Sequence, residues 1–170
     1  MGGPKALLAF EGETLLQRAI RMAQTAGCEP VIAVVGDWDP GPLDSSVRVI
    51  RNSEASEGMA SSLRHGVAAL PPDTASALFL VVDQPAVDVP LLQKLLSLTA
   101  EDPDRPAACA YAGTIGIPAV LPRRLFPELL ALRGDRGAKA ILLREGAAML
   151  AFAEGSADLD EPQDLDRLRR

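Results

Sequence analysis

The order of apolar and polar residues along the chain predicts alternating helices and strands. Residues 13–27 repeat apolar side chains at helical spacing, which indicates an amphipathic helix. Thr14 and Gln17 resemble a capping box at its start, and Gly27 can end it. Residues 31–35 are apolar without polar alternation, which is typical of a strand buried on both faces, as in parallel sheets.

The same pattern continues through the rest of the chain. Further strands are predicted at residues 47–50, 77–82, 107–111, 117–121 and 148–152, and further helices at residues 60–69, 89–98, 123–132, 136–144 and 161–168. Strands that alternate with helices of this length predict an α/β fold. We therefore expect a three-layer α/β/α sandwich with a mainly parallel sheet.

Length and composition agree with one folded unit. The chain has 170 residues, of which 48% are hydrophobic. A domain of this length buries roughly 70% of the surface that its unfolded chain exposes, and this composition is sufficient to fill such a core. Residues 1–170 are therefore expected to form a single domain, and a disordered chain is excluded.

Charge and hydropathy exclude two classes of partner. The 17 Lys and Arg against 23 Asp and Glu give a net charge of −6, and without a basic patch we expect no nucleic acid partner. No apolar run approaches the ~20 residues that span a bilayer, and no basic segment followed by an apolar stretch opens the chain. We expect a cytoplasmic protein without a membrane partner.

Several common types of active site lack support in this sequence. Cys28 and Cys109 lie far apart, which excludes a cysteine zinc site, and both are predicted to be small buried apolar residues. His65, the sole histidine, lies within a predicted helix without the partners of a catalytic triad. The chain has no Gly-x-Ser-x-Gly elbow, complete Walker loop or Gly-x-Gly-x-x-Gly after a strand, which argues against hydrolases, P-loop enzymes and dehydrogenases.

Asp83 is the most informative polar residue. The most apolar predicted strand, residues 77–82, delivers it at the strand's carboxyl end, where open α/β sheets bind ligands. A carboxylate there is costly unless it is paired or bound to a metal. We predict that Asp83 is a metal ligand. The alternative is that it caps the helix that begins near Asp88, although a gap of five residues is long for a cap.

A second acidic cluster occupies residues 158–165 and includes Asp158 and Asp160. Asp160 with Gln163 makes an N-cap and a capping box, and Pro162 suits a first helical turn. Capping and metal binding therefore both remain open for Asp160.

Three loops combine glycine with polar or basic residues, at residues 2–5, 57–63 and 134–139. Each loop can present backbone N–H groups, a hydroxyl or a cation to an anion at a helix N-terminus, or can be only a turn with a cap. All three are expected at the rim of the sheet that carries Asp83.

In combination these segments resemble the MobA/MocA-like nucleotidyltransferases, the family of molybdenum cofactor cytidylyl- and guanylyltransferases. The six matching segments, in the family's order, are Met1-Gly2-Gly3-Pro4-Lys5-Ala6-Leu7-Leu8, Asn52 with residues 57–66, Val82-Asp83-Gln84-Pro85, Gly116-Ile117-Pro118, Gly134-Asp135-Arg136-Gly137-Ala138 and residues 158–165. The Pro4-Lys5 and Asp83-Gln84-Pro85 segments are closest to the cytidylyltransferase branch. Ile117 stands where the family often has His, which bears on the identity of the substrate.

The resemblance implies a Mg²⁺-dependent enzyme with a fold like that of the nucleotide-diphospho-sugar transferases. Such an enzyme moves an NMP, here CMP more than GMP, from CTP or GTP to a small phosphate-bearing acceptor such as the molybdopterin cofactor, and releases pyrophosphate. The protein partner implied is a molybdoenzyme or its chaperone. Two other functions stay open, namely a sugar-1-phosphate nucleotidyltransferase and a non-enzymatic nucleotide- or cofactor-binding chaperone.

The resemblance also implies roles for individual residues. Lys5 and Asp83 would be catalytic, Lys5 by neutralising the triphosphate and Asp83 by holding Mg²⁺ with Asp160 or Asp158. The other implied residues are Gly2, Gly3, Lys5, Gly58, Ser61 and Ser62 for the nucleotide, and Gly116, Pro118, Gly134, Asp135, Arg136 and Gly137 for the acceptor.

One feature of the family has no counterpart in residues 1–170. Family members begin with a central strand and a Leu-Ala-Ala-Gly-x-Ser-x-Arg loop that wraps the triphosphate, and Met1-Gly2 resembles only the end of that loop. Without that strand, its neighbours would leave backbone groups unpaired, each at a cost of roughly 1 to 3 kcal/mol. A start codon assigned too late would explain the difference, and a trimmed or decayed protein is the alternative.

Overall fold

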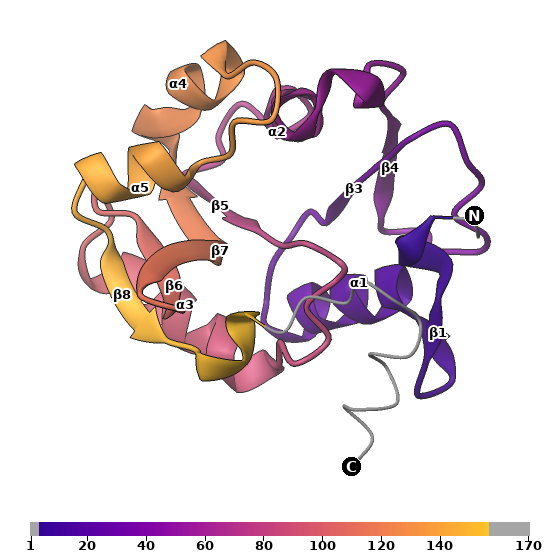
Figure 1. Cartoon of the computed structure of the whole chain (residues 1–170), viewed down its shortest axis with the longest axis horizontal. Coiled ribbons are helices and arrows are strands. Elements are labelled where there is room, and N and C mark those ends of the chain that lie inside the picture. Colours follow the sequence, from indigo (N-terminus) through magenta and orange to yellow (C-terminus); the bar gives the residue numbers. More distant parts are fainter. Residues whose placement is uncertain (1–3, 157–170) are drawn as a thin grey trace.

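The computed structural model describes residues 4–156 and confirms the α/β class (Figure 1). The helices are α1 (Leu15–Thr25), α2 (Met59–Ala68), α3 (Val89–Glu101), α4 (Phe126–Ala131) and α5 (Lys139–Arg144), with 3-10 segments η1 (Lys5–Leu7), η2 (Ala55–Glu57), η3 (Arg123–Leu125) and η4 (Ala153–Ser156). The strands are β1 (Ala9–Phe10), β2 (Glu13–Thr14), β3 (Ile32–Val35), β4 (Arg48–Arg51), β5 (Ser76–Phe79), β6 (Ala107–Tyr111), β7 (Thr114–Pro122) and β8 (Ala148–Ala151). The helix expected at residues 161–168 lies outside the described residues.

The strands of residues 4–156 form three sheets. β1 and β2 make a small antiparallel hairpin, β3 pairs with β4 in parallel, and the largest sheet has the order β5-β7-β6-β8. In that sheet β6 and β8 are parallel, whereas β7 is antiparallel to both β5 and β6. The expected mainly parallel sheet therefore has an exception in β7. The cause is the tight turn at Ala112 and Gly113, whose φ angles of 49° and 72° join β6 directly to β7 as a hairpin.

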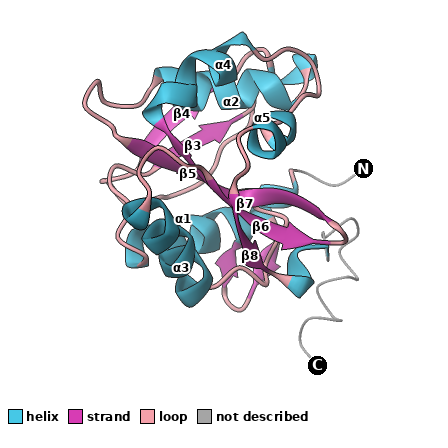
Figure 2. Cartoon of the chain, turned by 90° about the vertical axis from the view of Figure 1, so that its left-hand side faces the viewer, coloured by secondary structure: helices cyan, strands magenta, loops and turns pink. Residues whose placement is uncertain are grey.

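Helices cover both faces of the largest sheet, as a three-layer sandwich requires (Figure 2). On one face, Ala119 and Leu121 of β7 pack in a core cluster with side chains of α2, α4 and α5. On the other face, Val120 packs in a second cluster with side chains of α1 and α3. Because successive residues of a strand point to opposite faces, three consecutive residues of β7 serve both cores, and all three are fully buried.

Several local predictions can be compared with the structure. The capping box of α1 is present, since Gln17 N donates to Thr14 Oγ1 at 3.1 Å and Thr14 N donates to Gln17 Oε1 at 2.9 Å. Cys109 is buried, which raises the pKa of its thiol to about 12. The expectation of a buried residue is wrong for Cys28, which is only half-buried because it follows the end of α1 and lines a cavity.

That cavity, of about 480 Å³, lies between β3 and β5, the facing edge strands of two separate sheets. Ile32 and Val34 are half-buried, so the expectation that β3 is buried on both faces is wrong for alternate residues. Across this cavity β3 and β5 belong to separate sheets.

No helix within residues 4–156 is both long enough and apolar enough to cross a bilayer.

Truncation of a core leucine tests the central place of β7. Leu121 is fully buried, whereas Leu143 on α5 is 56% exposed. We expect Leu121→Ala to lower the free energy of unfolding by about 2 to 5 kcal/mol, and Leu143→Ala to change it by less than about 0.5 kcal/mol. Urea unfolding of the two variants measures the difference. Equal losses would contradict the assignment of β7 to the core.

Candidate functional site

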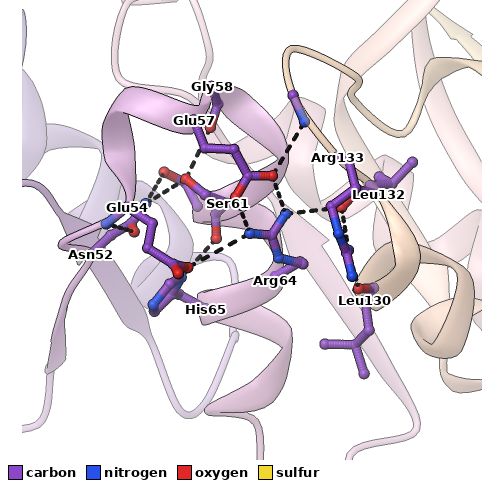
Figure 3. Close-up of polar contacts among 12 residues, drawn as sticks. Asn52, Glu54, Glu57, Gly58, Ser61, Arg64, His65, Leu130, Leu132 and Arg133 are labelled. Carbon is purple, nitrogen blue, oxygen red and sulfur yellow. Dashed lines mark hydrogen bonds and ion pairs between the residues drawn. The ribbon is translucent and has the colours of Figure 1, made fainter.

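The loop between β4 and α2 is held by a buried asparagine (Figure 3). Asn52 is 2% exposed. Its Nδ2 donates to the hydroxyls of Ser61 (2.8 Å) and Ser62 (3.1 Å), and its Oδ1 accepts from Glu54 N (2.9 Å). Asn52 therefore fastens the end of β4 to the first turn of α2 and orients the loop between them.

Gly58 brings two distant loops into contact. Its φ of 118° is unfavourable for other residues, and a Cβ built there would lie 2.3 Å from Asp135 Oδ1 and 2.7 Å from the carbonyl carbon of Gly134. Ala60 N also donates to Gly134 O at 3.0 Å. The predicted loops at residues 57–63 and 134–139 thus lie against each other, although they are far apart in the sequence.

Glu57 and Arg64 join the same two loops through an ion pair (Figure 3). Arg64 Nη1 donates to Glu57 Oε1 at 2.8 Å and to Leu132 O at 2.9 Å, and Gly134 N donates to Glu57 Oε1 at 3.3 Å. The hydrogen bond from Arg64, followed by that from Gly134, lowers the pKa of Glu57 from 4.5 to about 2. The ionised carboxylate therefore ties α2 to the segment after α4. This pair was not predicted, because its only signal in the sequence is two opposite charges seven residues apart.

Asp83 lies four residues beyond the last residue of β5, Phe79, so the expectation that the strand continues to residue 82 and delivers Asp83 at its carboxyl end is wrong in its bounds. Val82 packs near Leu8 and Leu15, close to the start of α1, and leaves Asp83 half-buried. The alternative role of Asp83 as a helix cap is excluded, because Asp88 caps α3 by accepting from Leu91 N at 2.8 Å.

Lys5 lies in the same region as Asp83. It is exposed and precedes Ala6, which belongs to a cluster that Val82 also packs against. The chain neighbours of Lys5 and Asp83, the two predicted catalytic residues, thus meet at one core cluster.

The loop that follows Asp83 is anchored from two sides. Gln84 Nε2 donates to Gly155 O at 3.0 Å, and Arg18 donates to Pro85 O through Nε (3.2 Å) and Nη2 (3.1 Å). Gln84 Oε1 is buried and has no hydrogen-bond partner within residues 4–156. Arg18 was not predicted as part of the site, because a helical arginine 67 residues from Pro85 carries no local signal.

The Gly116-Ile117-Pro118 segment lies in β7 against Tyr111. Tyr111 Oη donates to Ile117 O at 3.1 Å, and a Cβ at Gly116 would lie 2.4 Å from that phenolic oxygen. Pro118 is buried. The glycine is therefore required for the close packing of Tyr111 on this strand.

The remaining predicted site residues differ in their exposure and in their contacts. Asp135 and Arg136 are exposed, and a Cβ at Gly137 would come within 3.1 Å of Met59 Sδ. The hydroxyl of Ser61 is buried and donates to Gly58 O at 3.0 Å, and His65 Nδ1 lies 2.8 Å from Ser61 O within α2. Gly2, Gly3, Asp158 and Asp160 lie outside the described residues.

The chemistry of Asp83 suits a divalent metal. Within residues 4–156 no three His, Cys, Asp or Glu side chains are grouped so that they could hold a metal ion. Mg²⁺ does not need such a group, since it commonly binds one or two carboxylates together with water and substrate phosphates. A single half-buried carboxylate in the loop that follows β5 fits this mode of binding.

Comparison with known proteins places the chain among nucleotide-transferring enzymes. The sequence model of the MobA-like NTP transferase domain matches residues 1–149. Nicotine blue oxidoreductase from Paenarthrobacter nicotinovorans is 31% identical over 152 residues, which cover 82% of this chain and 73% of that protein. Purine catabolism protein PucB from Bacillus subtilis (strain 168) is 26% identical and covers 100% of this chain and 90% of its own length.

Among solved structures, Rv0371c from Mycobacterium tuberculosis H37Rv is similar in both fold and sequence. Its crystal structure has a TM-score of 0.80 at 27% identity and covers 99% of this chain and 90% of that chain. A second structure of Rv0371c, in complex with manganese, has a TM-score of 0.78 at 27% identity and covers 98% of this chain and 92% of that chain.

Substitution of Gly58 tests the contact between the two loops. Gly58 and Gly41 both have positive φ, but a Cβ at Gly41 would meet nothing within 4 Å. We expect Gly58→Ala to lower the free energy of unfolding by about 1 to 3 kcal/mol more than Gly41→Ala, because the added methyl overlaps the backbone of Gly134. Urea unfolding measures both variants, and losses of equal size would contradict the contact.

The low pKa of Glu57 gives a prediction about pH. Because the pKa is about 2 in the folded protein and ordinarily 4.5, the ionised form stabilises the fold. This contribution is complete above about pH 4.5 and is lost as the pH falls toward about 2. We expect Glu57→Gln to be less stable than wild type at pH 7, with a difference that shrinks over this range. Glu101→Gln, at an exposed position, is the control in urea unfolding, and a difference independent of pH would refute the ion pair.

Proposed function

Since the chain belongs to the MobA-like NTP transferase domain family, we propose that it is a nucleotidyltransferase that moves CMP from CTP to a small phosphate-bearing acceptor. The molybdopterin cofactor is the acceptor we propose, with a molybdoenzyme or its chaperone as protein partner. The observation that carries the proposal is Asp83, a half-buried carboxylate in the loop between β5 and α3 that is not a helix cap. The contact of Ala6 and Val82, the chain neighbours of Lys5 and Asp83, with one core cluster supports it.

Asp83 is the residue we propose to hold the divalent metal, Mg²⁺ or Mn²⁺, with Asp160 or Asp158 as a second carboxylate. The manganese complex of Rv0371c supports a divalent ion. When bound, such an ion neutralises phosphate charge. The loop at Gln84 and Pro85 keeps Asp83 in a constant position, because two hydrogen bonds restrain it. Gln84 Nε2 donates to Gly155 O, and Arg18 Nε donates to Pro85 O.

The transfer itself requires positioning and charge neutralisation. A phosphate oxygen of the acceptor attacks the α-phosphorus of CTP, the new P–O bond forms as the bond to the bridging oxygen breaks, and pyrophosphate leaves. The attacking oxygen is already anionic, so the site needs no strong general base. Lys5 neutralises the triphosphate. With a net charge of −6, local cations must act within a Debye length of about 8 Å.

The two joined loops supply the binding surfaces in this proposal. The hydroxyl of Ser62 accepts from Asn52 and retains its own proton for donation to the nucleotide. Ser61 and Gly58 shape the loop that carries Ser62, together with Gly2, Gly3 and Lys5 on the triphosphate side. The acceptor side comprises Gly116, Pro118, Gly134, Asp135, Arg136 and Gly137.

Radiolabelled CTP and GTP test the activity. We expect release of pyrophosphate that requires the acceptor and Mg²⁺ or Mn²⁺, and that is faster with CTP. Release with glucose 1-phosphate in place of molybdopterin would favour the sugar-1-phosphate enzyme, and binding without release would favour a chaperone. The name of one relative describes redox chemistry, so oxidation of NADH without pyrophosphate release would also contradict the proposal.

Asp83→Asn tests the proposed metal ligand. We expect it to abolish metal-dependent transfer, a loss of at least about 100-fold for a charge-stabilising group, without a change in the circular dichroism spectrum. Asp73→Asn, in an exposed turn between α2 and β5, removes the same charge and is expected to retain activity. Turnover of Asp83→Asn at the wild-type rate would refute the assignment.

A further inference from the structure

Trp38 lies at the carboxyl end of the parallel pair β3 and β4. The last residues of the two strands, Val35 and Arg51, are register partners. Trp38 follows β3 by three residues, and its carbonyl oxygen accepts from Arg51 Nη1 at 3.1 Å. Because open α/β sheets bind ligands beyond the carboxyl ends of their strands, Trp38 occupies a position that is suited to contact with a ligand.

Short-range contacts hold the indole of Trp38 in one place. Trp38 N donates to Gly36 O at 3.0 Å, and a Cβ built at Gly36 would lie only 3.1 Å from Trp38 Nε1 and 3.3 Å from Trp38 Cδ1. The side chain also packs against the core cluster that contains Ala6 and Leu16. The ring is therefore positioned before a ligand arrives, which lowers the entropic cost of binding.

Further contacts connect this position with the loop that carries Ser62. Asn52, which directly follows β4, donates through Nδ2 to Ser62 Oγ at 3.1 Å. A Cβ at Gly36, which directly follows β3, would lie 3.9 Å from Ala55 Cβ in η2. The indole nitrogen of Trp38 and the start of η2 thus lie on the same side of Gly36. Trp38 is therefore near the loop to which the nucleotide is assigned above.

Part of the Trp38 side chain stays open to a ligand. The residue is only half-buried. Within residues 4–156 its indole N–H takes part in no hydrogen bond, and the aromatic pair and the cation–π contact of this part of the chain involve other rings. An aromatic ring of this kind offers apolar area and a polar N–H to a planar ligand.

The charges beside Trp38 favour an uncharged part of a ligand. Asp37 and Asp39, its neighbours in the chain, are exposed. Even together with the guanidinium of Arg51 they leave a net negative charge, which repels a phosphate and does not repel a neutral ring. Lys5, the cation assigned above to the triphosphate, precedes a residue of the core cluster on which Trp38 packs. The region thus has separate places for a ring and for phosphates.

We propose that Trp38 binds the nucleobase of the donor nucleotide, whose ring stacks on the exposed part of the indole. The proposal rests on the nucleotidyl transfer proposed above and adds the place of the base to it. Every base has a π face, so stacking on an aromatic side chain tolerates different bases. Trp38 therefore contributes affinity for CTP and GTP alike, and the choice between them depends on other contacts.

Tryptophan fluorescence tests the proposal directly, because Trp38 is the only tryptophan of the chain. We expect saturable quenching by CTP and by GTP with Mg²⁺, and weaker saturable quenching by cytidine, which has the base without the phosphates. Inorganic tripolyphosphate is expected to leave the emission unchanged. N-acetyltryptophanamide, titrated in parallel, corrects for light absorption and for collisional quenching by the nucleotides.

Equilibrium dialysis with radiolabelled CTP measures the affinity of variants. We expect Trp38→Leu to raise the Kd about 10-fold, and Trp38→Phe, which retains an aromatic face, to raise it less. Leu43→Ala is the matched control and is expected to keep the wild-type Kd, because Leu43 is a half-buried side chain that packs against the same core cluster. Circular dichroism spectra check that each variant is folded. The fluorescence titration uses the wild-type chain and stays decisive where a variant does not fold.

The outcomes separate this proposal from the proposed function. Absence of CTP binding to the wild-type chain in dialysis would refute both. Binding of CTP without quenching by CTP or cytidine, and with the wild-type Kd in Trp38→Leu, would refute only the place of the base. Quenching by tripolyphosphate as strong as that by CTP would assign Trp38 to the phosphates, and an equal loss of affinity in Leu43→Ala would assign it a packing role. Either result would overturn the proposal.

Discussion

β7 is the strand on which the other elements depend. It is hydrogen-bonded on both edges, to β5 and to β6, and three consecutive buried residues, Ala119, Val120 and Leu121, divide their side chains between the two cores. Because β5 pairs with β7 alone in the largest sheet, the position of β5 is determined from that side. β5 then carries the chain toward Asp83, so the arrangement of the candidate site begins with the packing of β7.

The site itself is assembled by contacts between segments that are distant in the sequence. Gly58 is pressed against Gly134, and the carboxylate of Glu57 links Arg64 to the same segment. Such contacts require glycine or complementary charge at each point, because a side chain would overlap the facing backbone. The two loops therefore act as one surface, whereas the loop after Asp83 is restrained separately by Gln84 and Arg18.

Local signals in the sequence predicted much of this arrangement. The capping box was predictable because Thr14 and Gln17 are only three residues apart. The strands β3, β5 and β6 were predictable because each lies in a short continuous run of apolar residues. The hairpin of β6 and β7 was missed because Ala112-Gly113 lacks the Asn-Gly or Asp-Gly of a strong turn signal. The half-buried state of Val34 and Leu78 was also unpredictable, because it depends on which strands become neighbours.

In the function that we propose, a divalent metal and a nucleoside triphosphate bind together beside Asp83 and Lys5. Paramagnetic broadening of amide signals measures this directly when Mn²⁺ is added to the ¹⁵N-labelled chain with and without CTP, since the effect falls steeply with distance from the ion. We expect CTP to concentrate the broadening on Lys5, Val82 and Asp83, and the amides of α4 and α5 to stay sharp. Broadening that is the same with and without CTP, or that spares Asp83, would contradict it.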